Sequence, residues 1–112
     1  MVTPANGAVV LVRFPFSDLS NTKVRPAIVI ADASRGDWVL CQVTSQPYTD
    51  PTAIEITSTD FASGSLRKTS YARPGKLFTA NVGIMTKHIG NLQQAKLEEI
   101  IKTVILLLEK SL

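Results

Sequence analysis

Short apolar runs separated by turn-forming residues fill the first 90 positions of the chain. The runs are rich in Val, Ile and Thr, and each is bounded by Gly, Pro, Asn, Asp or Ser, which is typical of β-strands. The pattern therefore predicts strands at residues 8–14, 26–31, 37–44, 53–57, 70–73 and 76–79.

Turn-forming residues indicate how these strands connect. The tripeptide Arg35-Gly36-Asp37 lies between the second and third runs. Gly beside Asp is a natural hairpin connection, so we expect the second and third strands to pair as a hairpin. We place this hairpin at the centre of the sheet. Two prolines exclude a central strand from residues 45–52, which we predict as a loop. A second loop is expected at residues 58–69.

After Gly90 the apolar positions follow a helical period. Asn91 suits a helix N-cap, with Gln94 three residues later, and Ile105 and Leu106 widen the apolar surface of the helix. The positions at helical spacing are Leu97, Ile100, Ile101, Val104, Leu107 and Leu108. Short strands followed by one terminal helix predict a mainly β fold, a small, partly open barrel with the C-terminal helix packed across it.

Composition narrows the class of protein. With 112 residues, 45% of them hydrophobic and 19% charged, the chain is expected to form one domain over residues 1–112. One Cys and one His exclude a disulfide framework and supply too few ligands for a structural zinc site, so a metal ion would have to be held mainly by carboxylates. We expect no cofactor. The sequence has no signal peptide and no apolar run of about 18 residues, which favours the cytoplasm over secretion or a membrane.

The net charge of +3 is unevenly distributed along the chain. Residues 13–25 and 67–76 together carry seven Lys or Arg and one Asp, a net charge of +6 in 23 positions, against −3 in the remaining 89. If the two segments meet in space, they form a patch that suits phosphate. The alternative is a scatter of solvated charges, because strand alternation can send side chains to opposite faces.

Two short motifs carry candidate chemistry for binding a phosphate group. Arg25 precedes Pro26, which biases it to an extended conformation and fixes the direction of its guanidinium group at a sheet edge. Thr44 and Ser45 end a predicted strand just before the loop at Pro47. Their hydroxyls can donate to a phosphate oxygen, and ordinary strand-end capping is the alternative.

Several further motifs follow one another in a specific order over essentially the whole chain. They are Gly7, Val9-Val10-Leu11-Val12, Phe14-Pro15-Phe16-Ser17-Asp18, Lys23-Val24-Arg25-Pro26-Ala27-Ile28-Val29-Ile30, Val43-Thr44-Ser45, Ser70-Tyr71-Ala72-Arg73-Pro74, Lys76-Leu77-Phe78-Thr79 and Ile89-Gly90-Asn91-Leu92. In order and spacing they resemble the MazF/PemK family of toxin endoribonucleases. The resemblance implies an SH3-like barrel, a homodimer, and sequence-specific, metal-independent cleavage of single-stranded RNA. It also implies the cytoplasmic toxin of a type II toxin-antitoxin system, with an antitoxin protein as partner.

The resemblance assigns roles to individual residues. It implies that Arg25, Thr44 and Arg73 are catalytic. It also implies that Ser45 is a neighbouring contact. We further expect RNA contacts from Phe16, Asp18, Lys23, Gln46, Tyr48, Lys68, Ser70 and Lys76. Two positions depart from the family pattern: Ala8 stands where an Asp usually follows the first Gly, and Gly75 stands where the PemK branch has an Asp proposed as acid or base.

Other side chains have a simpler structural interpretation. Phe16 and Tyr48 can stack on bases, although Phe16 equally suits a core position. His88 lies far in sequence from Arg25, just before the helix, which favours a structural role over that of a general base. We expect Cys41 to be a small core side chain, and Trp38 to belong to the core or a dimer interface.

Two other functions are also compatible with the sequence. A gyrase-inhibiting toxin of the CcdB type shares the same barrel, and a member of the family without catalysis would retain only RNA or partner binding. The intact pairs Arg25-Pro26 and Thr44-Ser45 favour RNA cleavage, since a gyrase poison has no need of them. Gly75, in place of the PemK-branch Asp, keeps the non-catalytic alternative open.

Overall fold

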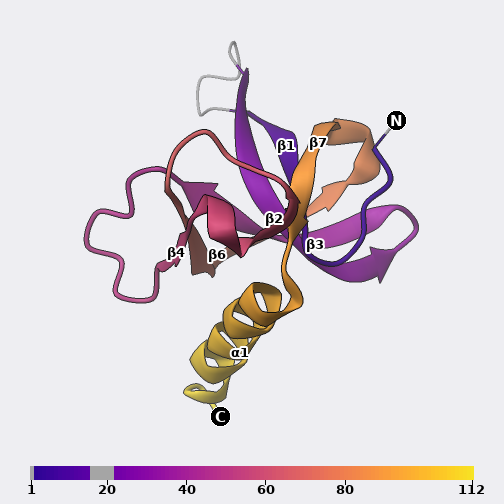
Figure 1. Cartoon of the computed structure of the whole chain (residues 1–112). Coiled ribbons are helices and arrows are strands. Elements are labelled where there is room, and N and C mark those ends of the chain that lie inside the picture. Colours follow the sequence, from indigo (N-terminus) through magenta and orange to yellow (C-terminus); the bar gives the residue numbers. More distant parts are fainter. Residues whose placement is uncertain (1, 16–21) are drawn as a thin grey trace.

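The computed structural model describes residues 2–15 and 22–112, in which seven strands form one antiparallel sheet followed by an α-helix (Figure 1). The strand order is β4-β6-β3-β2-β1-β7-β5, and the sheet curls into a half-barrel. The predicted mainly β fold with a C-terminal helix is confirmed. The elements are β1 (Ala8–Pro15), β2 (Thr22–Ser34), β3 (Asp37–Thr44), β4 (Ile54–Ile56), η1 (Ser58–Asp60), β5 (Phe61–Gly64), β6 (Ser70–Asn81), η2 (Val82–Ile84), β7 (Met85–Leu92) and α1 (Gln94–Glu109).

The β2–β3 hairpin lies at the centre of the sheet, as predicted, and β3 has the predicted bounds. Ser34 pairs with Asp37, so Arg35 and Gly36 form a two-residue connection. Their φ angles are 59° and 82°. Positive φ at both positions is the geometry of a type I′ turn, whose twist matches that of the flanking strands. Gly36 adopts this conformation without steric cost.

Pro26 lies inside β2, which corrects the prediction that the strand begins there. The pairing of β2 with β1 extends past Pro26, whereas its pairing with β3 starts only at Ala27, opposite Gln42. Around Pro26 the strand therefore has one partner among the described residues, and a missing backbone N–H is tolerated. As a result, β2 carries Arg25 beyond the β2–β3 ladder while β1 still holds it opposite Val12.

β6 is one strand where the sequence predicts two. Arg73 and Leu77 lie opposite adjacent residues of β3, so the three residues between them form a bulge. Pro74 belongs to this bulge and is fully buried. A bulge is one of the few places where a strand tolerates proline, so Pro74 and Gly75 bend the strand without ending it.

Two strands and the start of the helix differ from the prediction. β5 lies in the segment predicted as a loop, and β7 has no predicted counterpart. Asn91, the predicted N-cap, belongs to β7, where its side-chain amide donates to Ser63 Oγ at 2.9 Å. Gln93 is the N-cap, and its side chain donates to the carbonyl oxygen of Thr59 at 3.0 Å instead of capping the helix.

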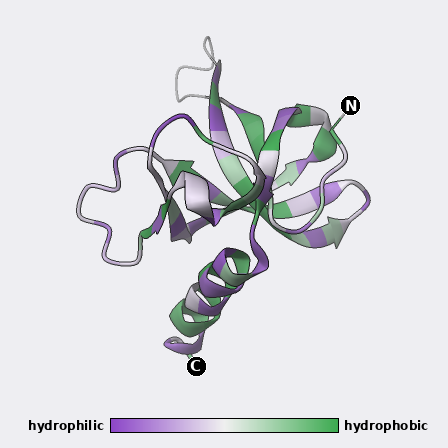
Figure 2. Ribbon diagram, in the orientation of Figure 1, coloured by the Kyte–Doolittle hydropathy of each residue, from purple (hydrophilic) through white to green (hydrophobic). Residues whose placement is uncertain are grey.

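Alternate positions of the central strands build two apolar clusters on opposite faces of the sheet. Hydrophobic residues, green in Figure 2, lie along the strands and on α1. Val9 and Cys41 belong to the cluster that α1 covers, and Val10 and Leu40 belong to the other. Cys41 is fully buried, as predicted, and burial raises the pKa of its thiol to about 12. The thiol is therefore protonated and inert at neutral pH. Trp38 packs partly buried against the second cluster.

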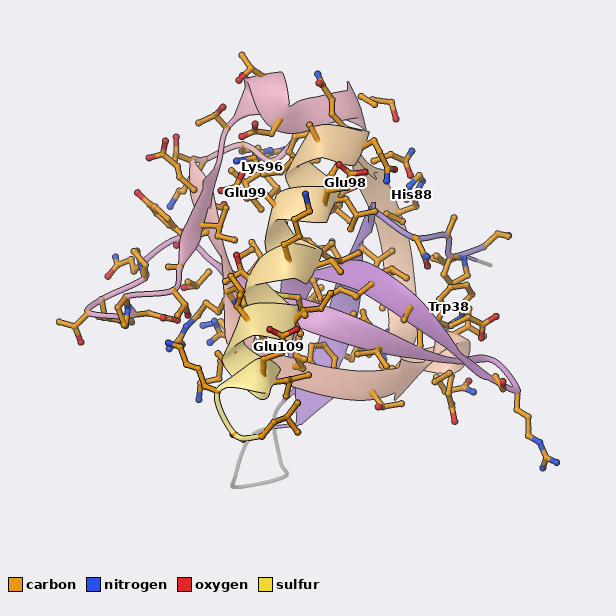
Figure 3. All side chains as sticks on the ribbon, turned by 90° about the horizontal axis from the view of Figure 1, so that it is seen from below. Trp38, His88, Lys96, Glu98, Glu99 and Glu109 are labelled. Atoms are coloured by element: carbon orange, nitrogen blue, oxygen red, sulfur yellow. The ribbon has the colours of Figure 1, made fainter. Side chains whose placement is uncertain are left out.

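α1 packs across one face of the sheet (Figure 3). Its buried residues are Leu97, Ile100 and Val104, three of the positions predicted to face the core. Lys96 fixes the start of the helix, because its ammonium group donates to Glu99 Oε1 at 2.9 Å and to the carbonyl oxygen of Glu55 at 3.3 Å. In the described part of the chain, no helix is long and apolar enough to cross a membrane.

Candidate functional site

Six of the residues predicted to act on RNA come together where β2 and β3 run past their shared ladder. They line a groove of about 450 Å³, the Arg25 groove. The walls come from β1, β2, the end of β3 and the segment between β5 and β6. Its described lining residues are Leu11, Lys23, Val24, Arg25, Pro26, Val43, Thr44, Ser45, Leu66, Arg67, Lys68 and Ser70.

The two basic segments of the sequence meet at this groove. Arg25 is half-buried on β2, beside exposed Lys23, and Arg67 and Lys68 approach from the other segment. None of the described lining residues is acidic. The fork-shaped guanidinium of Arg25 can engage two oxygens of a phosphate at once, so the groove has the charge and the donors to bind a phosphodiester backbone.

Two of the predicted hydroxyl contacts are engaged with their own backbone. Thr44 Oγ1 accepts from the N–H of Gln46 and donates to its carbonyl oxygen, both at 3.1 Å. This is the strand-end cap that the sequence left as an alternative. Ser70 is buried and its hydroxyl donates to the carbonyl oxygen of Lys68 at 3.0 Å. Ser45 is exposed at the rim.

Arg73, Tyr48 and Lys76 lie in a neighbouring hollow of about 310 Å³, the Arg73 hollow. Arg73 pairs with Gln42 across the β3–β6 ladder, and Thr44 follows Gln42 by two residues on β3. Side chains two residues apart on a strand share a face, so the two depressions lie at the same end of the sheet. The remaining lining residues of this hollow are Pro47, Thr49, Asp50, Pro51 and Gly75.

Asp50 is a site residue that the sequence reasoning missed. Its Oδ2 accepts from Arg73 Nε at 2.8 Å, and its Oδ1 accepts from the backbone N–H and the hydroxyl of Thr52 at 2.9 and 2.8 Å. The hydrogen bond from Arg73, followed by those from Thr52, holds the pKa of this carboxyl below its ordinary value. Asp50 is therefore ionised at neutral pH and compensates the charge of Arg73.

Gly75 lines the same hollow as Asp50. The hollow therefore contains a carboxylate, that of Asp50, although position 75 itself carries none. A Cβ at Gly75 would meet only Leu107, at 3.6 Å, so nothing in the packing requires glycine at this position. The loop at residues 45–52, predicted from its prolines, brings Asp50 to Arg73 from 23 residues away in the chain. Only the tertiary structure reveals this pair.

The remaining predicted residues are placed as follows. Phe16 and Asp18 lie outside the described residues. Gln46 is exposed, and its backbone holds the Thr44 hydroxyl. His88 is exposed on β7, where its Nε2 lies 3.2 Å from Asn91 Oδ1, and it does not line the Arg25 groove. Within residues 2–15 and 22–112, no three His, Cys, Asp or Glu side chains form a group that could hold a metal ion.

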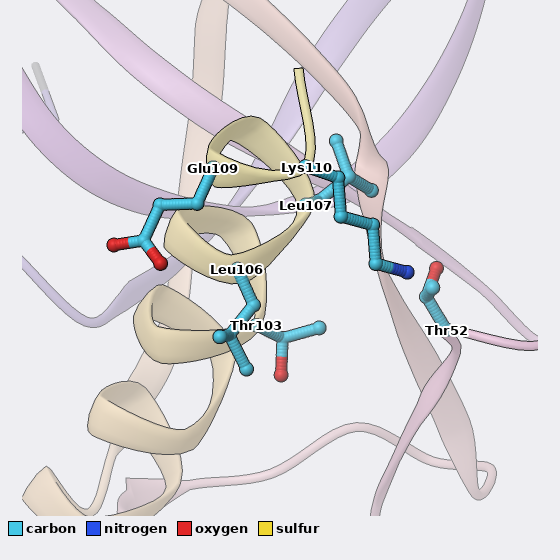
Figure 4. Close-up of a pocket in the computed structure, with 6 residues that line it drawn as sticks. All are labelled: Thr52, Thr103, Leu106, Leu107, Glu109 and Lys110. Atoms are coloured by element: carbon cyan, nitrogen blue, oxygen red, sulfur yellow. The ribbon is translucent and has the colours of Figure 1, made fainter. Parts of the chain in front are cut away.

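A third concavity lies beside the C-terminal turns of α1 (Figure 4). It measures about 460 Å³ and lies between Leu106, Leu107 and Lys110 on the helix and Thr52 at the end of the 45–52 loop. Leu106 is 60% exposed. Four of its six lining residues, Thr52, Thr103, Glu109 and Lys110, are polar, but most of its surface is apolar. It contains an acidic residue, unlike the described lining of the Arg25 groove.

Several solved structures share this fold. The MazE-MazF complex from Deinococcus radiodurans, form II, contains a chain 18% identical to this one, with 97% of this chain and 98% of that chain covered and a TM-score of 0.77. An endoribonuclease in complex with its cognate antitoxin from Mycobacterial species is 19% identical, with 96% of both chains covered and a TM-score of 0.72. The Mycobacterium tuberculosis toxin MazF-mt6 is 13% identical, with 87% of this chain and 91% of that chain covered and a TM-score of 0.67.

The sequence carries the family assignment, because identities this low show only a shared fold. No protein of curated function matches the chain in sequence. The model of the family described as PemK-like, MazF-like toxins of type II toxin-antitoxin systems matches residues 5–108, nearly the whole chain. The chain therefore belongs to the PemK-like, MazF-like toxins of type II toxin-antitoxin systems.

Proposed function

We propose that this toxin is an endoribonuclease that cuts single-stranded RNA at specific sequences without a metal ion. The observation that carries the proposal is the Arg25 groove, where Lys23, Arg25, Arg67 and Lys68 surround an opening with no acidic residue among its described lining. Such a groove suits the anionic backbone of a nucleic acid. Solved structures with the same fold include proteins named as endoribonucleases.

The chemistry uses the 2′-hydroxyl of the RNA as nucleophile. Its oxygen forms a bond to the adjacent phosphorus and loses its proton, and the bond from phosphorus to the 5′-oxygen breaks as that oxygen gains a proton. The products are a 2′,3′-cyclic phosphate and a 5′-hydroxyl. Arg25 acts by stabilising the additional negative charge on the phosphorane, and the groove acts by holding the phosphate in line with the attack.

Thr44 and Ser45 would fix the scissile phosphate beside Arg25. Ser45 reaches it from the exposed rim of the groove. Thr44 reaches it when its hydroxyl turns from the carbonyl oxygen of Gln46, while its oxygen still accepts from the N–H of Gln46. The hydroxyl thereby exchanges its hydrogen bond to the carbonyl oxygen for one to the phosphate. Because the number of hydrogen bonds is unchanged, the exchange costs little free energy.

The Arg73 hollow would hold a nucleotide next to the cut. Tyr48 is 81% exposed and offers its ring for stacking on a base. Lys76 supplies a cation in the same hollow. Arg73, held through Nε by Asp50, keeps its other two guanidinium nitrogens for the phosphate or the base. The loop at residues 45–52, which carries Tyr48, would then select the sequence that is cut.

Arg25→Ala tests the proposal directly. Because Arg25 supplies the preorganised charge, its loss is expected to slow cleavage of a long RNA about 100- to 1,000-fold, a cost of about 2.7 to 4 kcal/mol. Arg25→Lys is expected to restore only part of the rate, since an ammonium group cannot engage two oxygens in a fork. Sequencing of 5′ ends and analysis of the termini measure the outcome, with and without EDTA.

Arg35→Ala is the matched control, because it removes the same charge from the tip of the β2–β3 hairpin. We expect it to cut RNA at the wild-type rate. Cleavage by Arg25→Ala at the wild-type rate, or loss of wild-type activity in EDTA, would contradict the proposed mechanism. Binding of RNA that stays uncut in the wild-type protein would favour the non-catalytic alternative, and inhibition of gyrase without RNA binding would favour a toxin of the CcdB type.

We further propose that the toxin acts as a homodimer and is bound by an antitoxin. Ile105, Leu106 and Leu108 are 47%, 60% and 58% exposed on α1, and they offer an apolar face to a second copy. An acidic, initially disordered antitoxin segment would suit the positive charge around the Arg25 groove. Some of the solved structures with this fold are complexes with an antitoxin.

A further inference from the structure

The Arg25 groove continues beyond the residues that we assign to the cut. A second hollow of about 410 Å³ lies over β1 and β7 and shares Leu11, Leu66 and Arg67 with the groove. We call it the Lys87 hollow. Its described lining residues are Leu11, Ser65, Leu66, Arg67, Lys87, His88 and Ile89. Because three residues line both depressions, the depressions adjoin, and we call the two together the trough.

The register of the sheet gives the direction of this trough. On β1, Leu11 lies opposite Pro26 of β2 on one side and opposite Lys87 of β7 on the other. Opposed residues on neighbouring strands place their side chains on the same face. With strands about 4.8 Å apart, Pro26 in the Arg25 groove and Lys87 in the Lys87 hollow lie about 10 Å apart across β1 on this face.

The segment that forms the shared wall is anchored at its apolar residue. Leu66 is partly buried and packs against the core cluster beneath α1. At one end of the segment, Gly64 pairs with Gly90 on β7, and at the other end Ser70 pairs with Ile56 on β4. Arg67 is exposed between these anchors. Its backbone position between the two depressions is therefore fixed by the fold.

The trough is positively charged along its whole length. Arg67 and Lys87 make no ion pair with any of the described residues, and no acidic side chain is present in the described lining of either depression. Arg67 and Lys87 line the same hollow without a carboxylate and repel each other, so their arrangement costs stability unless an anion is bound. His88 adds a side chain that becomes cationic on protonation.

We propose that Arg67 and Lys87 bind the phosphates of nucleotides that flank the cut on the β7 side. This inference rests on the proposed function, since it extends the RNA from Arg25 across β1. Arg67 belongs to one of the two basic segments of the sequence, and Lys87 lies outside both. The Lys87 hollow therefore gives a higher affinity for RNA that extends past the scissile phosphate than for RNA that does not.

The test compares short and long RNA that cannot be cleaved because every 2′-hydroxyl is methylated. The double variant Arg67→Ala/Lys87→Ala is expected to bind a 12-mer more weakly than the wild type does. It is expected to bind a 4-mer centred on the cleavage sequence with the wild-type affinity. Lengths of about 12 and 4 nucleotides fall in the range of single-strand sites. Each lost phosphate contact makes the salt dependence shallower by about 0.7, so the slope of log affinity against log salt falls by about 1.4 for the long RNA.

Arg35→Ala/Lys102→Ala is the matched control, because it removes the same charge from the hairpin tip and from an exposed position of α1. It is expected to keep the wild-type length and salt dependence. Arg67→Gln/Lys87→Gln, checked by thermal unfolding, repeats the test with longer polar side chains in place of Ala. A double variant that binds the long RNA with the wild-type affinity and slope overturns the inference, and so does equal weakening for both lengths.

Cleavage separates this inference from the proposed function. If the double variant cuts a short RNA at the wild-type rate and a long RNA more slowly, both hold. If the wild type binds the methylated RNA with the predicted length dependence but cuts no RNA, the nuclease proposal fails and the Lys87 site stands. If an acidic peptide, but no RNA, is bound through Arg67 and Lys87, the trough is a protein-binding surface and the inference is wrong.

Discussion

At the scale of single residues, the ion pair between Asp50 and Arg73 is the contact that most constrains the site. The carboxylate accepts three hydrogen bonds, and the side chain of Asp50 is only 10% exposed. Charge-assisted bonds to a sheltered carboxylate contribute more than an exposed surface pair does. Asp50 therefore orders both the 45–52 loop and the direction of the Arg73 guanidinium.

Asp50→Asn is expected to lower the free energy of unfolding by about 1 kcal/mol at neutral pH, since it removes a charge-assisted bond. The pKa of Asp50 is lowered in the folded state by Arg73 and Thr52. Its contribution is therefore fully present above the ordinary pKa of 3.8 and is lost as the pH falls through the lower folded value. Urea unfolding at pH 7 and at about pH 2 should show the difference between wild type and variant closing in acid.

Glu98→Gln is the control for this measurement, because Glu98 is exposed on α1 and makes no ion pair within the described part of the chain. Its stability should follow that of the wild type at both pH values. A gap between Asp50→Asn and the wild type that persists unchanged in acid would show that the charge of Asp50 does not stabilise the fold. Cleavage by Asp50→Asn should also slow, because Arg73 loses its orientation.

At the scale of elements, the junction of β5 and β7 depends on two opposed glycines. Gly64 has φ +69°, and a Cβ there would collide with the backbone carbonyl of Ile89. A Cβ at Gly90 would collide with the backbone carbonyl of Ser63. The strands approach closely because neither glycine has a side chain, and this contact fixes the start of the segment that carries Arg67.

Gly64→Ala is therefore expected to destabilise the protein by about 2 to 3 kcal/mol, through the cost of positive φ for an L-residue and the displacement of β5. Gly75→Ala is the matched control: its Cβ has space, and its change should stay within about 0.5 kcal/mol. Urea denaturation measures both. Equal stability of the two variants would mean that β5 separates from β7 without cost.

The elements also show what the sequence could and could not predict. The β2–β3 hairpin was predicted because two apolar runs flank a Gly beside an Asp, and the turn uses Gly36 at positive φ. β7 was not, because three consecutive residues of the strand, Thr86, Lys87 and His88, are exposed and its partner β1 lies more than 70 residues earlier in the chain. Long-range pairing leaves no local period, so neither β7 nor the Lys87 hollow could be deduced from the pattern.

At the same scale, local sequence signals identified the correct types of element but placed some of their boundaries wrongly. Pro74 and Gly75 suggested a break between two strands, yet the bulge absorbs them within β6. Asn91 had the chemistry of an N-cap, but pairing with Ala8 keeps it in β7. The predicted catalytic residues lie in two depressions, Arg25 and Thr44 in the Arg25 groove and Arg73 in the Arg73 hollow. The sequence indicates the types of these residues but not the loop that brings Asp50 to Arg73, so it could not predict this division.

At the scale of the whole molecule, charge and apolar surface are separated. Five of the twelve Lys and Arg residues, Lys23, Arg25, Arg67, Lys68 and Lys87, line the trough. Exposed apolar side chains lie instead on α1, where two Lys and three Glu leave a net charge of −1. A second copy joined through α1 would leave the trough open to RNA on each subunit, so the two proposals are compatible.

Leu106→Glu/Leu108→Glu tests this arrangement. Burial of each leucine in a dimer contributes roughly 1.5 to 3 kcal/mol, and each glutamate would instead place a charge in an apolar contact. Light scattering is expected to give twice the chain mass of 12.1 kDa for the wild type and 12.1 kDa for the variant. Both positions are exposed in the single chain, so the variant should keep its circular dichroism spectrum.

Arg35→Glu is the control, because it introduces a negative charge at the tip of the β2–β3 hairpin, outside α1, and it should remain dimeric. A wild-type protein that scatters as a monomer, or a double variant that stays dimeric, would show that α1 is not the interface between copies. A folded monomeric variant then measures what dimerisation adds to catalysis. Since all the residues of the trough belong to one chain, the monomer should still bind the short RNA, and any loss of cleavage would come from nucleotides held by the second copy.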